Sequence, residues 1–201
     1  MRERPILMNG DMVRAILAGT KTQTRRPVKL NPSGRAVLGG RNWHLDDPDC
    51  VKACPFGQPG DRLWVRETWG QDEALCEGVQ YRADWGQEAQ DHAANHSEWR
   101  WSPSIHMPRW ACRLVLEIVF VRVERLQEFG PNDAKAEGFD TLPDADRVRF
   151  EEVEHFGVRR ANYALREFRR TWNAIYAAKG QGWDANPWVW VVEFKRTEAS
   201  A

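Results

Sequence analysis

The sequence predicts an α+β protein, a small and mostly β barrel with helices at its rim and long loop insertions. In residues 111–124 apolar side chains alternate, which predicts a strand that we place at the centre of the sheet. In residues 160–178 apolar side chains recur at the helical period, which predicts the longest helix. The other apolar runs are short and bounded by turn residues, as in short strands. The apolar face of the central strand comprises Cys112, Leu114, Leu116, Ile118 and Phe120.

The N-terminal third contains a strand, a helix and a second strand. Residues 4–8 form the first strand, and the turn Asn9-Gly10-Asp11 supplies a helix N-cap. Apolar residues within 12–17 then lie on one helical face. Alternating threonines in 20–26 indicate the second strand, which Pro27 stops.

The remaining elements are separated by three insertions. The first insertion, at 28–60, is rich in Gly, Pro and Cys, the second at 70–108 is polar, and the third at 140–158 is acidic. We expect these to be mainly loops, with one short strand inside the second. The short strand inside the second insertion is at 79–82. The predicted elements between and after the insertions are strands at 62–69 and 187–195 and a short helix at 134–137 that Gly138 closes.

Length and composition favour a single folded domain over residues 1–201. The chain has 201 residues, of which 42% are hydrophobic and 29% charged, and these values exclude a wholly disordered chain. No stretch approaches 18 apolar residues, and Met1 is followed by Arg-Glu-Arg-Pro, so we expect neither a membrane span nor an export signal. A cytoplasmic protein with reduced cysteines is the resulting expectation.

The charge distribution favours an anionic partner without requiring one. The formal net charge is zero, which excludes a polybasic binder at the level of the whole chain. Residues 1–41 nevertheless hold nine Lys and Arg against two Asp and Glu, a local excess of +7. The chain has 11 Trp, and 23 of its 29 cationic residues are Arg. Arg and Trp suit stacking on nucleobases, although an aromatic core has the same composition.

Lys21 and Thr24 are the first candidates for chemistry. Both follow the first helix, in the segment Gly19-Thr-Lys-Thr-Gln-Thr-Arg-Arg26. A lysine whose pKa is lowered would take the proton of a threonine hydroxyl and make it a nucleophile. Residues three apart point to opposite faces of a regular strand, so a bend or bulge is needed to bring the two together. The alternative is an exposed lysine on an edge strand with threonines chosen for β propensity.

Four further residues are candidates of lower specificity. Glu137 ends the short helix, where the helix dipole disfavours a carboxylate and suits a proton donor. Arg66 and Glu67 are charged residues inside an apolar strand and point to opposite faces, so at least one would face a cavity or a partner. His106 stands in a loop before Pro-Arg and would serve as a base or a ligand contact. Each is equally compatible with an ordinary surface or paired side chain.

Metal and cofactor motifs are missing from the sequence. His44, Cys50 and Cys54 do not have the spacing of a zinc site, and neither do His92 and His96. Glycine-rich phosphate loops and the common hydrolase signatures are also missing. We therefore expect neither a metal nor a cofactor.

Four segments taken in order resemble the ASCH domain, a family of the PUA-like superfold. They are Gly-Thr-Lys-Thr-x-Thr-x-Arg near the start, Gly-Asp-x-Leu-Trp-Val-Arg-Glu in the middle, Ala-x-x-Glu-Gly-Phe after the long strand and a final Val-Val-Glu-Phe. The long insertions are similar to those of prophage-associated ASCH proteins. The resemblance covers most of the chain and implies a β-barrel with a cleft for RNA or a nucleotide.

The resemblance also implies roles for individual residues. Some small ASCH proteins are amidohydrolases that remove the acetyl group of N4-acetylcytidine, and their working residues match Lys21, Thr24 and Glu137. The implied roles are base for Lys21, nucleophile for Thr24, and proton donor or positioning group for Glu137. Arg26, Arg66 and Glu67 would line the same cleft. This chain is about twice as long as those proteins, which leaves the substrate open.

The leading hypothesis is therefore a domain that binds RNA or a modified nucleoside or nucleotide, with hydrolysis of an N-acyl group as its activity. One alternative is a non-catalytic RNA-binding module, which the basic N-terminal segment and the tryptophans favour. Another is a ribonuclease with His106 or Lys21 as the base. A fourth is an accessory protein whose Trp-rich loops contact another protein.

Overall fold

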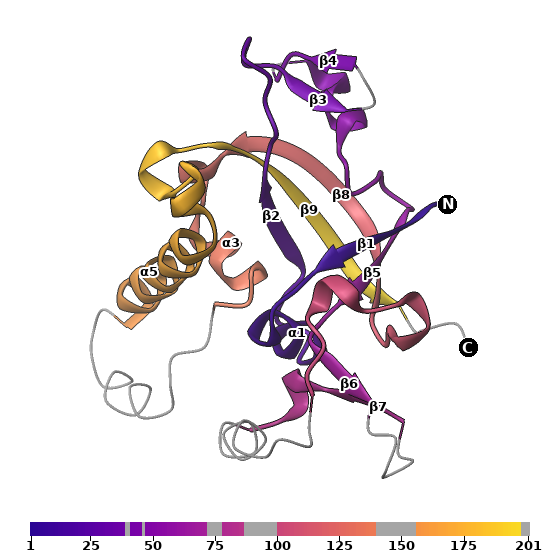
Figure 1. Cartoon of the computed structure of the whole chain (residues 1–201). Helices are drawn as coiled ribbons and strands as arrows, with labels where there is room; N and C mark the ends of the chain where they lie inside the picture. The colour runs from indigo at the N-terminus through magenta and orange to yellow at the C-terminus, as the bar shows by residue number, and fades with distance from the viewer. Residues whose placement is uncertain (39–40, 46, 72–77, 87–99, 140–155, 198–201) are drawn as a thin grey trace.

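The computed structural model describes residues 1–38, 41–45, 47–71, 78–86, 100–139 and 156–197. It confirms the predicted α+β class, with one five-stranded sheet and helices around it (Figure 1). The strand predicted from residues 111–124 is the middle strand of this sheet. The strands in spatial order are β1 (Glu3–Leu7), β5 (Arg62–Arg66), β8 (Val115–Arg125), β9 (Trp188–Thr197) and β2 (Gln23–Pro27).

The sheet is strongly curved but does not close into the predicted barrel. β1 pairs with β5 in parallel, and the other neighbours are antiparallel. β1 and β2 are the two edges, and within the described residues no ladder joins them. A side chain connects them instead, because Nη2 of Arg26 on β2 donates to the carbonyl oxygen of Leu7 on β1 at 2.9 Å. The largest of the cavities described below is lined by Leu7 and Arg26 at this open edge.

The predicted face of the central strand is correct only up to Ile118. The pairing of β8 with β9 shifts between Ile118 and Phe120, so Val119 is an extra residue in the strand. Such a bulge moves the following side chains to the opposite face. Phe120 is consequently 50% exposed, and Val121 takes the buried position instead.

β9 is buried on both faces and separates two hydrophobic clusters. Trp190, Val192 and Phe194 belong to the larger cluster, with α1 (Gly10–Leu17), β1, β5 and β8. Val189 and Val191 belong to the smaller one, with α3 (Pro131–Ala136) and α5 (Phe156–Tyr176). A strand buried on both sides is a continuous apolar run, which is why this element is readily predicted.

The helices agree in type with those expected. Asn9 caps α1 through its side chain, which accepts from the backbone N–H of Met12 at 2.9 Å. α3 begins at Pro131, in the first turn where a missing N–H costs nothing. α5 presents Phe168 and Trp172 to the smaller cluster. None of the helices in the described part of the chain is long and apolar enough to cross a membrane.

The predicted insertions contain short ordered elements. Residues 28–60 hold a hairpin of β3 (Ala36–Leu38) and β4 (Arg41–Trp43), followed by the 3-10 helix η1 (Pro48–Ala53). β6 (Trp69–Gln71) pairs with β7 (Val79–Tyr81), and most of the third insertion lies outside the described residues. The other 3-10 helices are η2 (Arg82–Asp84), η3 (Ser104–His106), η4 (Arg109–Ala111), η5 (Leu126–Glu128), η6 (Ala177–Lys179) and η7 (Trp183–Ala185).

Candidate functional site

Lys21 and Glu137 form a buried ion pair at the junction of α1, α3 and β2. The Nζ atom of Lys21 lies 2.6 Å from Oε2 of Glu137 and 3.2 Å from the main-chain oxygen of the same residue. The two residues also form an isolated antiparallel bridge, and the N–H of Thr22 donates to the carbonyl oxygen of Ala136. The chain leaving α1 thus pairs with the end of α3 before it enters the sheet at Gln23.

Gly138 allows this close approach. Its φ is +90°, and a Cβ atom there would lie 2.8 Å from the Cβ of Ala15 and 3.3 Å from the Cβ of Lys21. Only glycine adopts this backbone conformation without strain and leaves room for α1 at the same time. The residue that closes the short helix therefore also sets the position of the Glu137 carboxylate.

Arg25 holds the other oxygen of Glu137. The Arg25 side chain is fully buried, and its Nη1 lies 3.3 Å from Oε1 of Glu137. Its Nη2 lies 2.6 Å from Oε1 of Glu124 and 2.8 Å from Oδ1 of Asp133, and its guanidinium stacks 4.8 Å from the ring centre of Phe129. Glu137 therefore has one oxygen on Lys21 and the other on Arg25, which fixes the carboxylate in orientation.

The environment lowers the pKa of Lys21. Burial is the largest cause, since it penalises the charged amine. The Glu137 carboxylate opposes this effect, while the nearby cations of Arg26 and Arg25 add to it. A buried amine with a lowered pKa is chemically suited to accept a proton.

Thr24 lies beside Arg26, and no hydrogen bond joins it to Lys21 in the described structure. Thr24 is completely buried, and its hydroxyl accepts from Nη1 of Arg26 at 2.7 Å. On one face of this segment, α3 or the residue that ends it is contacted by Lys21, Gln23 and Arg25. On the other face, Thr24 contacts Arg26. Arg26 also reaches the end of β1. The alternation of β2 thus separates Thr24 from the Lys21–Glu137 pair, and Thr24 contacts Arg26 instead.

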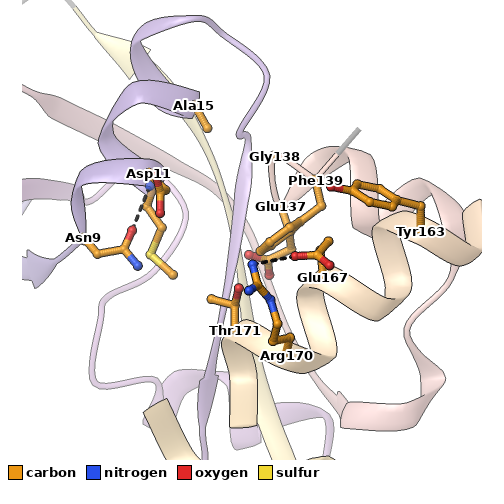
Figure 2. A pocket seen from close by; sticks show the side chains of 11 residues that line it. Asn9, Asp11, Ala15, Glu137, Gly138, Phe139, Tyr163, Glu167, Arg170 and Thr171 are labelled. Atoms are coloured by element: carbon orange, nitrogen blue, oxygen red, sulfur yellow. Dashed lines mark hydrogen bonds and ion pairs between the residues drawn. The ribbon is translucent and has the colours of Figure 1, made fainter. Parts of the chain in front are cut away.

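Glu137 lines a cavity of about 210 Å³ between α1 and α5. Figure 2 shows Asn9 and Asp11 at the start of α1 on one side, with Glu137, Glu167 and Arg170 on the other. Nη2 of Arg170 lies 2.7 Å from Oε2 of Glu167. The rings of Phe139 and Tyr163, together with Met12, supply the apolar part of the wall. The cavity thus combines carboxylates with aromatic rings.

A second, larger cavity of about 670 Å³ adjoins the first, with which it shares Asn9 and Met12. It lies along the end of β1, and both Arg26 and Arg66 line it. Ser104 and Tyr176 contribute hydroxyl groups to its wall. Two of the predicted site residues therefore line this neighbouring cavity, and Arg26 also borders, with Glu137, a small pocket of about 20 Å³.

Glu67 belongs to a separate ion-pair cluster. It is buried, and its two oxygens accept from Nε and Nη2 of Arg113 at 2.9 and 3.0 Å. Arg113 also contacts Asp84, with its Nη1 2.6 Å from Oδ2. Burial raises the pKa of Glu67, and Arg113 opposes that shift. Glu67 lines a third hollow of about 270 Å³, on the side of α1 that Asn9 and Asp11 also border.

His106 is exposed in η3 and lines none of the three cavities. Among the described residues, His, Cys, Asp and Glu do not gather into a group that would hold a metal ion. Cys50 and Cys54 are buried free thiols, while His92 and His96 lie outside the described residues.

Two sets of site residues are not identified by the sequence analysis. Arg25 is one, although two adjacent arginines in one strand imply that one of them faces inward and is paired. The other is the polar face of α5, where Tyr163, Glu167 and Arg170 follow a spacing of four and three residues. That spacing places them on one helical face and is visible in the sequence.

Comparisons with known proteins give distant structural likenesses. No family model matches the sequence, and no curated protein matches it. The structure is similar to protein EF3133 from Enterococcus faecalis V583, of family model DUF984, with 9% identity and a TM-score of 0.45 over 98% of this chain and 81% of that one. It is also similar to an ASCH domain from Lactobacillus crispatus JV V101, with 12% identity and a TM-score of 0.35 over 97% of this chain and 79% of that one. At these values neither likeness indicates what this chain does.

Proposed function

We propose that the chain is an ASCH-type domain that binds a modified pyrimidine nucleoside, free or within RNA, in the cavity at Glu137. The four sequence segments that resemble the ASCH domain support this proposal. The observation that carries it is the position of Glu137, which borders the cavity while its carboxylate is held by Lys21 and Arg25. A buried charged pair that reaches a cavity wall is expensive to maintain for stability alone.

The lining of the cavity suits a flat, amine-bearing heterocycle. Carboxylates of Asp11, Glu137 and Glu167 accept hydrogen bonds, and the exocyclic amine of cytosine donates them. The rings of Phe139 and Tyr163 provide surfaces for stacking, which is the usual recognition of an unpaired base.

The activity we propose is hydrolysis of the N-acyl group of N4-acetylcytidine. In the structure Thr24 is completely buried and held by Arg26 on the other face of β2, so this step requires the Thr24 side chain to turn toward Lys21 and the Glu137 cavity. Lys21, as the neutral amine that its lowered pKa favours, then takes the hydroxyl proton of Thr24, and Oγ1 of Thr24 forms a bond to the acetyl carbon. The bond from that carbon to N4 then breaks, and Lys21 returns the proton to N4, releasing cytidine. Water hydrolyses the acetyl-threonine to acetate. Glu137 orients the Lys21 amine, and Arg26 must release the Thr24 hydroxyl before this step.

Incubation with N4-acetylcytidine and chromatographic detection of cytidine test the activity. Wild type and the control Lys29→Ala should release cytidine, whereas Lys21→Met and Glu137→Gln should lose at least about a hundredfold in kcat/KM. Lys29 is exposed and lines none of the cavities described above, so it is a matched control. Equal rates in wild type and Lys21→Met would exclude the catalytic proposal.

A non-catalytic RNA-binding module is the second candidate, and the basic segment at 1–41 favours it. It predicts saturable binding of single-stranded RNA without cleavage or deacetylation. The affinity should fall as salt is added, because contacts with phosphates release counterions from the RNA and this release is less favourable at high salt. An affinity that does not change with salt would count against this candidate.

A further inference from the structure

The larger cavity beside the proposed nucleoside site is cationic. Three of the residues that line it are cations, namely Arg26, Arg66 and Lys179, and none is an aspartate or glutamate. This contrasts with the adjoining cavity, which is lined by Asp11 and two glutamates. In a chain with equal numbers of acidic and basic residues, a wall without a carboxylate concentrates positive charge.

Neutral groups hold all three cations, so their charge is not compensated. Arg26 donates to the Thr24 hydroxyl, to the carbonyl oxygens of Arg25 and Leu7 and to the sulfur of Met8. None of these acceptors is negatively charged. Arg25, Arg113 and Arg122 elsewhere in the chain each contact at least two carboxylates.

Arg66 and Lys179 have no anionic partner in the described part of the chain. The Nη2 of Arg66 donates to the carbonyl oxygen of Ile105, while its Nε is buried and has no hydrogen-bond partner in the described structure. The amine of Lys179 lies 5.7 Å from the ring centre of Tyr176, and no ion pair is formed by either cation within the described residues. Cations that no carboxylate neutralises attract an anion to the cavity wall that they line.

The size and position of the cavity fit one part of a ligand that continues into the Glu137 cavity. Its volume of about 670 Å³ lies in the usual range for small-molecule sites. The two cavities share Asn9 and Met12, so a single ligand would contact both. Thr68 and Ser104 add hydroxyl donors beside the cations. Guanidinium, ammonium and hydroxyl donors are the groups that bind phosphate oxygens.

We infer that this cavity is a phosphate subsite, so that the ligand at Glu137 is a phosphorylated nucleoside. Arg66 and Lys179 bind the phosphate, and Arg26 adds its charge from the wall of the same cavity. The nucleoside half of this inference rests on the proposed function, whereas the phosphate half rests on the cations alone. The phosphate is either the 5′-phosphate of a mononucleotide or a backbone phosphate of RNA.

Calorimetric titration at low salt tests the subsite with cytidine, cytidine 5′-monophosphate and the dinucleotide CpC lacking a terminal phosphate. At least one phosphorylated ligand should bind about tenfold or more tightly than cytidine, as expected for one charge-assisted contact. A gain for the monophosphate alone assigns the subsite to a terminal phosphate, and a gain for CpC assigns it to the RNA backbone. Equal affinities of all three ligands would overturn the inference.

Variants separate the subsite from general electrostatics. Lys179→Ala should remove most of the phosphate gain, and Arg66→Gln should do the same. Lys29→Ala carries the same charge change at a site away from the cavities and should keep the gain. Lys179 is exposed, so its replacement leaves the fold intact. Loss of the gain in Lys29→Ala to the same extent would refute a localised subsite.

A base-free probe makes the two proposals independently testable. Inorganic pyrophosphate should raise the melting temperature of wild type and not that of Lys179→Ala. If it does so while no nucleoside binds, the phosphate subsite stands and the proposed function fails. If N4-acetylcytidine is deacetylated while neither phosphate nor pyrophosphate has any effect, the proposed function stands and the subsite is refuted.

Discussion

Replacement of Glu137 by glutamine would leave the Lys21 amine buried without its counterion. At the observed separation of 2.6 Å the attraction of the two charges is about 6 kcal/mol at an effective dielectric constant of about 20. Removing one partner of a buried pair typically lowers the free energy of unfolding by about 3–5 kcal/mol, and we expect that loss for Glu137→Gln at neutral pH. This is a large share of the stability of an ordinary domain.

The pH dependence of this loss distinguishes it from a packing defect. The pKa of Lys21 is already lowered in the folded protein, and removal of Glu137 removes the main influence that raises it. Between the folded and the unfolded pKa the unfolded chain binds more protons, so the free energy of unfolding rises with pH, by at most about 1.4 kcal/mol per pH unit. Glu137→Gln should therefore regain stability as the pH approaches the ordinary pKa of lysine.

Urea unfolding followed by tryptophan fluorescence at several pH values measures both effects. The double variant Lys21→Met/Glu137→Gln is the control, since it lacks the amine. It should be more stable than Glu137→Gln at neutral pH and should lack the added pH dependence. A Glu137→Gln protein within about 1 kcal/mol of wild type, or one whose stability is flat with pH, would refute the buried-pair reasoning.

Three further outcomes follow from local geometry. Gly138→Ala should lower the free energy of unfolding by about 1–3 kcal/mol in urea titrations, because residue 138 has a positive φ and its added Cβ would clash with Ala15. Gly180 has a similar φ but open space around it, so Gly180→Ala is the control for backbone strain alone. Asn9→Ala should lower the free energy of unfolding by about 1 kcal/mol, because the N-cap of α1 is lost. Asn9→Asp should retain most of the wild-type stability, because aspartate also caps a helix. Burial raises the pKa of Cys54 to about 11, so mass spectrometry should find this thiol unmodified by iodoacetamide at pH 8 in the folded protein and modified in urea; rapid labelling without urea would contradict its burial.

Much of the fold is predictable because it depends on local patterns. The helical period of α5, the apolar run of β9 and the Asn9 cap each act within a few residues of sequence. The bulge at Val119 is different, because it depends on the register of β8 against a strand some seventy residues away. The parallel pairing of β1 with β5 is likewise non-local, and neither segment has a sequence pattern that predicts it.

In the candidate site, too, the features that the sequence indicates are distinct from those that depend on distant residues. The family resemblance pointed to Lys21 and Glu137, and they lie in contact. Thr24 is matched by the same signature, but strand alternation directs it toward Arg26. The burial of Arg25 among three carboxylates depends on residues about a hundred positions away, so its role could not be read from its neighbours.

Binding of N4-acetylcytidine, measured by calorimetry on wild type, Glu137→Gln and Tyr163→Ala, addresses the proposed site most directly. One saturable site in wild type, weakened about tenfold or more in both variants, is the result we predict, since one residue accepts hydrogen bonds and the other provides a stacking surface. Absence of binding to wild type, or equal affinities in all three proteins, would show that this cavity is not a nucleoside site.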